Sequence, residues 1–197
     1  SDTEERYGKK SDWTESDSKY IDEDEVSDGT GQDNSNDVPG GSTTPGGGTT
    51  DVGWRQDGNT WYFKYPDGNY IKDNWLKWND KWYLFDSSGR MLTGWQKKNN
   101  YWYYLGENGD MKKGWLQSGN IWYYLNPNDG GPEGAMVTNS WLTINGKTYF
   151  VNESGIMVEG WYQIEGNYYY FYPGDGSKAV STSISGFVLD ANGVWQH

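Results

Sequence analysis

The sequence predicts an all-β protein, a solenoid of β-hairpins preceded by a disordered acidic tail. Three observations support this prediction. The apolar content of the 197 residues is mainly aromatic, with 13 Trp, 17 Tyr and 5 Phe against 24 Val, Ile and Leu together. An aromatic pattern recurs along residues 54–182 in steps of 21, 20, 20, 26 and 20 residues. The residues before it are acidic, rich in Gly and poor in aromatic side chains.

The first 53 residues carry 14 acidic side chains, 4 basic ones and three aromatic ones. A segment with so high a net charge and so few apolar groups cannot offset the entropy of ordering its chain. We therefore expect residues 1–38 to form a disordered acidic tail and residues 39–53 to form a Gly/Ser/Thr/Pro linker. A short partner-binding motif around Trp13 or Tyr20 is the alternative interpretation of the tail.

Composition excludes several classes of function. The formal net charge of −12 argues against nucleic acid as a partner. The chain has no cysteine, and its one histidine, His197, is the last residue, so disulfides, thiolate–metal sites and His-based catalytic triads are excluded. No apolar run reaches the roughly 18 residues that a membrane span needs. We expect no metal site and no cofactor.

The repeat begins each time with a tryptophan that follows Gly, Asn or Ser. These residues are Trp54, Trp75, Trp95, Trp115, Trp141 and Trp161. Seven residues later the first four units have a second tryptophan, at Trp61, Trp82, Trp102 and Trp122, whereas the fifth and sixth have Thr148 and Tyr168. Six units at such a short period indicate a repeat architecture in which each unit buries its apolar face on the next.

Each unit is predicted to be a β-hairpin. Turn-forming pairs such as Asn99-Asn100 and Asn145-Gly146 separate the two aromatic segments and supply the positive φ angles of tight hairpin turns. A single hairpin is marginal in water, but six in series can stack. The extra residues 127–133 are expected to form a protruding loop that locally changes the superhelical turn. Residues 183–197 are expected to form a C-terminal cap on the solenoid. A self-association surface is the alternative interpretation.

Strand alternation suggests where a ligand binds. In the segment Trp102-Tyr103-Tyr104, Trp102 and Tyr104 share one face and Tyr103 points to the other. Two tryptophans of one hairpin and an aromatic ring of the next could form a three-sided box, closed by a methionine. Such an uncharged box suits a quaternary ammonium group, which is attracted to ring faces. The alternative is that the rings only form the core, and both interpretations can hold at once.

Two units, GWQKKNNYWYYLGENGDMKKGW (94–115) and GWLQSGNIWYYL (114–125), resemble the choline-binding, or cell-wall-binding, repeats of streptococcal surface proteins and phage lysins. The resemblance covers residues 54–182. It implies a left-handed hairpin solenoid that binds choline or phosphocholine on (lipo)teichoic acids. It further implies a secreted protein that is held on the cell surface without covalent attachment. Such a protein could serve as an adhesin. The sequence points to no particular host partner.

The resemblance also implies choline-binding residues, two tryptophans from one repeat and an aromatic from the next. The expected sites are Trp75 and Trp82 with Tyr104, Trp95 and Trp102 with Tyr124, Trp115 and Trp122 with Phe150, and Trp54 and Trp61 with Leu84 or Tyr83, with Met111 and Met136 as closing side chains. The first tyrosine of each segment, Tyr103 or Tyr123, remains an alternative third wall. Thr148 is expected to break the box of Trp141 and Tyr170.

Two other functions stay open. A glucan- or polysaccharide-binding module also uses aromatic faces, usually with convergent carboxylate or amide groups. The chain could also be the wall-anchoring part of a larger wall hydrolase. No catalytic residue is expected in the sequence itself, because the 53 residues outside the repeats are too few and too polar for a catalytic core.

Overall fold

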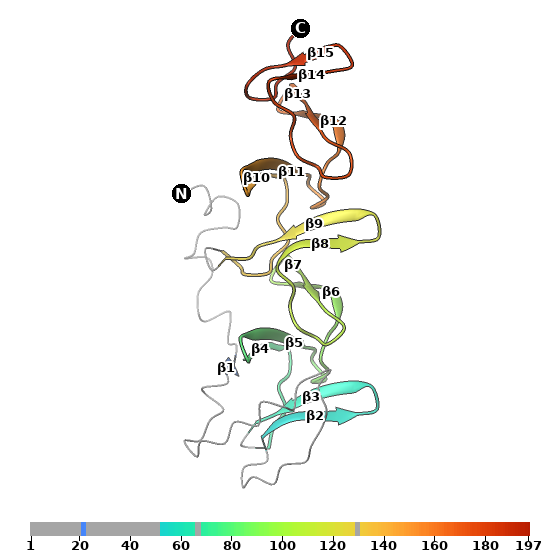
Figure 1. Ribbon diagram of the computed structural model, residues 1–197. Coiled ribbons are helices and arrows are strands. Elements are labelled where there is room, and N and C mark those ends of the chain that lie inside the picture. Colours follow the sequence, from blue (N-terminus) through green and yellow to red (C-terminus); the bar gives the residue numbers. More distant parts are fainter. Residues whose placement is uncertain (1–20, 23–51, 66–67, 129–130) are drawn as a thin grey trace.

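The computed structural model describes residues 21–22, 52–65, 68–128 and 131–197. These residues form a column of consecutive antiparallel β-hairpins and contain no helix (Figure 1). The all-β hairpin solenoid predicted from the sequence is therefore observed. The expected disordered tail (1–38) and linker (39–53) lie outside the described residues, apart from residues 21–22 and 52–53.

Hairpins 1 to 6 pair five-residue strands and hairpin 7 pairs three-residue strands. The strands are β2 (Gly53–Asp57) and β3 (Thr60–Lys64) in hairpin 1, β4 (Asn74–Trp78) and β5 (Lys81–Phe85) in hairpin 2, β6 (Gly94–Lys98) and β7 (Tyr101–Leu105) in hairpin 3, β8 (Gly114–Ser118) and β9 (Ile121–Leu125) in hairpin 4, β10 (Ser140–Ile144) and β11 (Lys147–Val151) in hairpin 5, β12 (Gly160–Ile164) and β13 (Asn167–Phe171) in hairpin 6, and β14 (Thr182–Ile184) and β15 (Phe187–Leu189) in hairpin 7. Residues 183–197, the expected cap, thus contain most of a shortened seventh hairpin.

The hairpin turns follow from their sequence. In hairpin 3 both turn residues have positive φ, 50° at Asn99 and 67° at Asn100. In hairpin 5 the corresponding values are 51° at Asn145 and 77° at Gly146. Two consecutive positive φ angles define the turn whose twist matches that of the flanking strands, and Asn and Gly adopt them at low cost. In these hairpins the turn chemistry therefore favours the observed register.

That register places the two tryptophans of a hairpin on one face. In hairpin 2, Trp75 is opposite Leu84 and Lys77 is opposite Trp82. Because side chains alternate along a strand, Trp75 and Trp82 lie on the same face and Tyr83 lies on the other. We call these the tryptophan face and the tyrosine face. The same register recurs in hairpins 1, 3 and 4.

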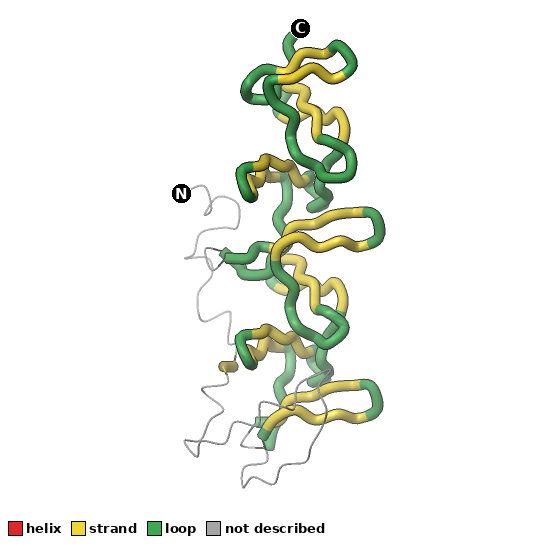
Figure 2. The backbone as a smooth tube through the Cα atoms, viewed as in Figure 1, coloured by secondary structure: helices red, strands yellow, loops and turns green. Residues whose placement is uncertain are grey.

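Consecutive hairpins are joined by a backbone hydrogen bond that recurs along the column. The amide of Met111, after hairpin 3, donates to the carbonyl of Trp82 in hairpin 2 at 2.8 Å. Equivalent bonds join Met91 to Trp61, Met136 to Trp102, Met157 to Trp122, Lys178 to Thr148 and Trp195 to Tyr168. Each hairpin is thereby rotated by a similar amount relative to the one before. Accordingly β2–β3 and β8–β9 project in the same direction, as do β4–β5 and β10–β11 (Figures 1 and 2).

The core is a chain of small apolar clusters along the column. One contains Leu76, Tyr83 and Phe85 of the tyrosine face of hairpin 2, all at most 2% exposed, with Trp54 and Phe63 of hairpin 1. Burying a side chain of this size contributes about 1.5–3 kcal/mol. Similar clusters recur further along the chain. The fold is therefore stabilised unit by unit, between neighbours.

The insertion at residues 127–133 does not interrupt the hydrogen bonds that join successive hairpins. Residues 129–130 lie outside the described residues, but Asn126 before them is buried and its side-chain amide donates to the carbonyl of Pro132 at 3.3 Å. The amide of Met136 still donates to Trp102, as in units without an insertion. The described part of the insertion thus does not alter how hairpin 4 is joined to hairpin 3.

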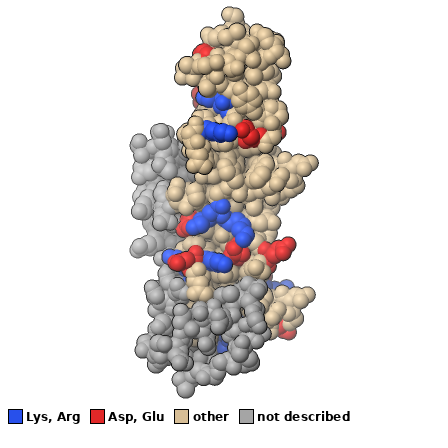
Figure 3. All heavy atoms as spheres, viewed as in Figure 1, with Lys and Arg blue, Asp and Glu red and all other residues tan. Residues whose placement is uncertain are grey.

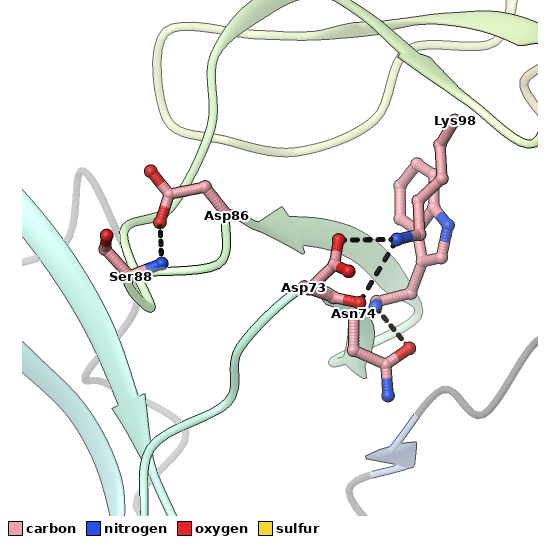
Figure 4. Close-up of polar contacts among 6 residues, drawn as sticks. Asp73, Asn74, Asp86, Ser88 and Lys98 are labelled. Carbon is pink, nitrogen blue, oxygen red and sulfur yellow. Dashed lines mark hydrogen bonds and ion pairs between the residues drawn. The ribbon is translucent and has the colours of Figure 1, made fainter.

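Charged side chains gather in patches on the face drawn in Figure 3, with uncharged surface between them. Some charged side chains link neighbouring units. The Lys98 ammonium donates to the carboxylate of Asp73 at 3.0 Å and to its backbone carbonyl at 3.1 Å (Figure 4). Asp73 has a φ of 47° and directly precedes β4. An exposed pair of this kind contributes about 0–1 kcal/mol, so it orients the segment more than it stabilises the fold.

One further pairing connects the first part of the sequence to the column. The two-residue strand β1 (Ile21–Asp22) runs parallel to β4, with Ile21 opposite Leu76 and Asp22 opposite Lys77. It makes a three-stranded sheet of β1, β4 and β5. Among the described residues there is no helix able to span a bilayer, and no group of three His, Cys, Asp or Glu side chains placed to hold a metal ion.

Candidate functional site at the junctions between hairpins

The candidate sites lie where the tryptophan face of one hairpin meets the tyrosine face of the next. We number these junctions by the earlier hairpin, so junction 2 joins hairpins 2 and 3. At junction 2 the rings of Trp75 and Trp82 are 6.3 Å apart between centroids and nearly perpendicular, at 86°. Tyr103 of hairpin 3 lies 4.9 Å from Trp75 at 72°. Three rings from two hairpins thus form a corner.

Junction 4 repeats this corner with closely similar geometry. Trp115 lies 6.4 Å from Trp122 at 89° and 5.1 Å from Tyr149 of hairpin 5 at 70°. At junction 3, Trp95 lies 4.9 Å from Tyr123 of hairpin 4, and Trp102 is 41% exposed. The exposure of Trp102 leaves an indole surface available to a ligand.

Junction 1 has the same rings but is more closed. Trp54 lies 6.2 Å from Trp61 and 4.8 Å from Tyr83. It is also packed against Phe63 and Phe85 and is only 4% exposed. Most of its indole surface is therefore already covered by the core. Tyr83, not Leu84, is the residue of hairpin 2 that meets it.

The third ring at each junction is the first tyrosine of the aromatic segment and not the second. Tyr104 lies against Trp95 of its own hairpin at 5.2 Å, and Tyr124 lies against Trp115 of its own hairpin at 5.0 Å. Register explains this, because these pairs are cross-strand neighbours on the tryptophan face. The expected grouping of Tyr104 with Trp75 and Trp82, and of Tyr124 with Trp95 and Trp102, therefore differs from the observed one.

Phe150 follows the same rule. It lies 5.1 Å from Trp141 of its own hairpin and is 5% exposed within the cluster that includes Val158 and Phe171. Its expected place beside Trp115 and Trp122 is taken by Tyr149. The sequence alone leaves this choice open, because alternation defines two faces but does not tell which of them meets the preceding hairpin.

Methionines lie beside three of the corners. Met91 packs with the cluster of Trp54 and Trp61, Met111 with Trp75 and Tyr103, and Met157 with Trp115 and Trp122. Met136 is joined to Trp102 at junction 3 by its backbone amide. Thioether sulfur is polarizable and packs well beside aromatic rings. Met111 thus packs beside the rings of junction 2, whereas Met136 is joined to junction 3 through its backbone.

The junctions are electrostatically suited to cations. The side chains that form the corners are uncharged, and burial, with a smaller effect of Asp110, raises the pKa of Tyr83 to about 12. Burial likewise raises the pKa of Tyr103 well above its usual range. The rings already attract ammonium groups of the chain itself, since Lys77 lies 5.9 Å from the Trp82 ring and Lys97 lies 5.9 Å from the Trp102 ring.

Junction 5 departs from this pattern. Trp141 meets Tyr169 of hairpin 6 at 5.0 Å and 73°, which is the same two-ring corner as elsewhere. Thr148 stands where junctions 1 to 4 have the second tryptophan, and Lys178 stands where they have methionine. Tyr170, the expected third ring, lies against Trp161 of its own hairpin.

Junction 6 is a ring cluster that sequence reasoning missed. Phe187 of hairpin 7 lies 5.7 Å from Trp161 and 5.6 Å from Trp195, and Trp195 lies 6.0 Å from Tyr168. Trp161, Tyr168 and Phe187 are 39–46% exposed. Trp195 takes the methionine position, because its amide donates to Tyr168. The spacing from Leu189 to Trp195 equals that from Leu105 to Met111 and could have identified it.

A polar cavity of about 360 Å³ lies beside junction 2. Its lining includes Lys77, Asp80, Trp82, Asn128 and Glu133. The Glu133 carboxylate accepts a hydrogen bond from the Lys113 ammonium, which also lines the cavity. This cavity combines an aromatic ring with carboxylate and amide groups, unlike the uncharged corners.

Comparisons with known proteins agree with this architecture. The family model described as a choline-binding repeat matches residues 73–111, 92–141 and 137–183, and a cell wall binding repeat model matches residues 52–70. The comparison with curated protein sequences found no match.

Solved structures of pneumococcal choline-binding proteins are similar to the chain. Choline binding protein F from Streptococcus pneumoniae is 43% identical, with a TM-score of 0.65, over 74% of this chain and 48% of that protein. The same protein crystallised with a peptidoglycan analogue, a tetrasaccharide-pentapeptide, matches equally well, with 43% identity, a TM-score of 0.65 and coverage of 74% and 47%. CbpJ from Streptococcus pneumoniae TIGR4 is 40% identical, with a TM-score of 0.66 and coverage of 74% and 48%.

The chain thus spans about half the length of these solved relatives. The matched repeats coincide with hairpins 1 to 6, whose tryptophans and tyrosines form the junctions. The chain belongs to the choline-binding repeat family.

Proposed function

We propose that junctions 2, 3, 4 and 6 bind the trimethylammonium group of choline, and that the module thereby holds its protein on choline-decorated teichoic acid. The observation that carries the proposal is the recurring uncharged corner of rings from two hairpins, as at Trp75, Trp82 and Tyr103. A quaternary ammonium group cannot lose its charge or donate a strong hydrogen bond, so ring faces are its natural partners. Junction 1 is assigned to the core, because Trp54 is already buried.

The magnitude is reasonable for a polymer-binding module. Each well-placed ring face contributes about 0.5–2 kcal/mol to the binding of a cation. Three faces contribute about 1.5–6 kcal/mol, which brackets the roughly 4.1 kcal/mol of a millimolar dissociation constant. Several such sites on one chain, facing a polymer with many choline groups, gain about 10² or more in avidity. The module can therefore bind the wall with high affinity although each site binds choline weakly.

Attachment through teichoic acid is supported by the family and by the geometry of the junctions. The junctions recur along one column of consecutive hairpins, which suits a repeated polymer rather than an isolated small molecule. An adhesin role and secretion to the cell surface belong to the same proposal. So does a non-catalytic role for this chain.

The test is competitive elution. The protein is bound to a quaternary-amine resin and to choline-containing cell walls, then washed with choline, ethanolamine or glucose oligomers. Choline at millimolar concentration should elute it, whereas ethanolamine, which has the same skeleton without the methyl groups, should do so far less. Trp102→Ala should weaken retention, and Ile121→Ala, which removes another exposed apolar side chain, should not. Retention that choline leaves unchanged would contradict the proposal.

A polysaccharide is the second candidate ligand, because of the polar cavity beside junction 2. Trp82 could stack on a sugar ring while Asp80, Asn128 and Glu133 accept or donate hydrogen bonds to its hydroxyls. Elution by glucose oligomers, lost in Asp80→Ala and kept in Trp102→Ala, would favour this candidate over choline.

A further inference from the structure

Junction 5 keeps half of the corner found at the other junctions. Trp141 and Tyr169 lie 5.0 Å apart at 73°, and Trp75 and Tyr103 at junction 2 lie 4.9 Å apart at 72°. The first tryptophan and the first tyrosine are thus held as elsewhere. The difference lies in the remaining positions, where a methionine and the second tryptophan are replaced.

Lys178 occupies the methionine position in its backbone contacts. Its amide donates to the Thr148 carbonyl at 2.7 Å, as the amide of Met111 donates to Trp82. It forms an isolated bridge with Phe171, as Met111 does with Leu105. The lysine side chain therefore starts from the place where a thioether starts at junctions 1 to 4.

The ammonium group of Lys178 lies on the ring corner. Its Nζ is 5.0 Å from the centroid of the Trp141 ring and 5.7 Å from that of Tyr169. Both distances are within the roughly 6 Å over which a cation is attracted to a ring face. Two rings of adjacent hairpins thus share a cation that belongs to the chain.

The surroundings keep this side chain in place. The Cγ and Cδ of Lys178 lie so near Gly193, in the turn after β15, that a Cβ on the glycine would be 3.2 and 3.1 Å from them. Burial lowers the pKa of the Lys178 ammonium, and the charge of Asp190 opposes that effect. Thr148 in place of an indole shortens the opposite wall. The apolar stem therefore packs against Gly193 while its ammonium group lies over the two rings.

We propose that Lys178 is a tethered occupant of junction 5, which fills with its own ammonium the place that choline takes at other junctions, and so closes this junction to ligand. The proposal rests on the function proposed above for those junctions. A cation attached to the chain competes at a high effective concentration, and the missing indole removes one face that would favour an incoming ligand. Lys178 and Thr148 together would then determine how many choline groups the module holds.

The first experiment needs no choline. Lysines of the full chain are reductively dimethylated with ¹³C-formaldehyde, which preserves their charge, and the methyl signal of Lys178 is assigned with Lys178→Arg. A group lying over two rings should show an upfield ring-current shift relative to the exposed Lys81, and Trp141→Leu should reduce that shift. A Lys178 signal at the position of the Lys81 signal would overturn the proposal.

The second experiment opens the junction. Lys178→Met combined with Thr148→Trp recreates the residues of junction 2, and crystals of this variant and of the unchanged protein are soaked in choline. We expect one additional choline, at junction 5, in the double variant, and none there in the unchanged protein or in the control Lys81→Met. Choline at junction 5 of the unchanged protein, or none there in the folded double variant, would overturn the proposal. If no junction of the unchanged protein held choline, the proposed function would fail, whereas the NMR result would still report on Lys178.

Discussion

The side chain of Met91 lies against Gly109 of the next unit, in the space that a Cβ on the glycine would need. Gly109 also has a φ of 82°, a conformation that side chains with a Cβ rarely adopt. The same relationship joins Met111 to Gly134 and Met136 to Gly155. Each methionine therefore serves two junctions, by its backbone to the hairpin before and by its side chain to the unit after.

Gly109→Ala should destabilise the fold by more than backbone strain alone. Left-handed φ costs a residue with a Cβ about 1–2 kcal/mol, and crowding against Met91 adds about 1–3 kcal/mol. Gly119→Ala is the matched control, because Gly119 has a φ of 63° but no atom near its Cβ position. Urea denaturation of both variants measures the difference. Equal destabilisation would show that the contact with Met91 contributes nothing.

Tyr103→Leu should weaken choline binding at junction 2 while keeping most of the buried apolar volume. Leucine offers no ring face to a cation, so about 0.5–2 kcal/mol of binding free energy is lost at that junction. Tyr103→Phe, which keeps the ring, should bind as the unchanged protein does. Choline titration followed by tryptophan fluorescence provides the measurement. If choline binding at junction 2 were lost in Tyr104→Leu but kept in Tyr103→Leu, the second tyrosine of the segment would be the third wall of the site.

Trp195→Ala should abolish choline binding at junction 6. It takes away one of the rings that surround Phe187 at the end of the column, without touching junctions 2 to 4. Val188→Ala is the control, because Val188 is in the same hairpin and 55% exposed. Choline-soaked crystals should show junction 6 empty in the first variant and filled in the second. If choline occupied junction 6 equally in Trp195→Ala and in the unchanged protein, the indole of Trp195 would not be part of the site.

Choline should raise the melting temperature in proportion to the logarithm of its concentration at high concentration. A ligand held between two hairpins binds only the folded state, and at 100 times its dissociation constant it stabilises that state by about 2.7 kcal/mol per site. Differential scanning fluorimetry with choline and with ethanolamine measures this. Similar shifts with both compounds would point to a general salt effect.

Stability should fall above about pH 10, the ordinary pKa of a tyrosine in an unfolded chain. Because burial raises the pKa of Tyr83 to about 12 in the folded state, the unfolded chain loses this proton first as the pH rises. The contribution of Tyr83 to stability is therefore complete below about pH 10 and is lost between there and about pH 12. Tyr83→Phe should make the decline less steep in denaturation curves at pH 9 to 12, whereas choline binding should be flat from pH 5 to 8.

The hairpins could be predicted because their signals are local. A turn such as Asn99-Asn100 requires positive φ at both residues, and it favours the register observed between the strands on either side. Nothing beyond a single unit is needed to recognise them. The choice between Tyr103 and Tyr104 is different, because it depends on the rotation from one hairpin to the next. That rotation is a property of the stacked column, and no single unit encodes it.

The residues at the methionine position of the last two junctions could not be predicted, for another reason. A motif defined by its most frequent residues, such as methionine after the second strand, does not flag a position filled by Lys178 or Trp195. The equivalence becomes visible in the backbone, where both residues bond to the hairpin before them as Met111 does. Equivalent places in a repeat are defined by these bonds rather than by residue identity.

The bonds that link each hairpin to the one before it also have a mechanical consequence. Because they connect successive hairpins in series, a pull between the wall and a distant part of the protein would load every link of the column in turn. The weakest link would yield first, and each bound choline would reinforce only the link beside it. Attachment under flow would then depend on how evenly mechanical strength is distributed among the links of the column, and not on the average strength of a link.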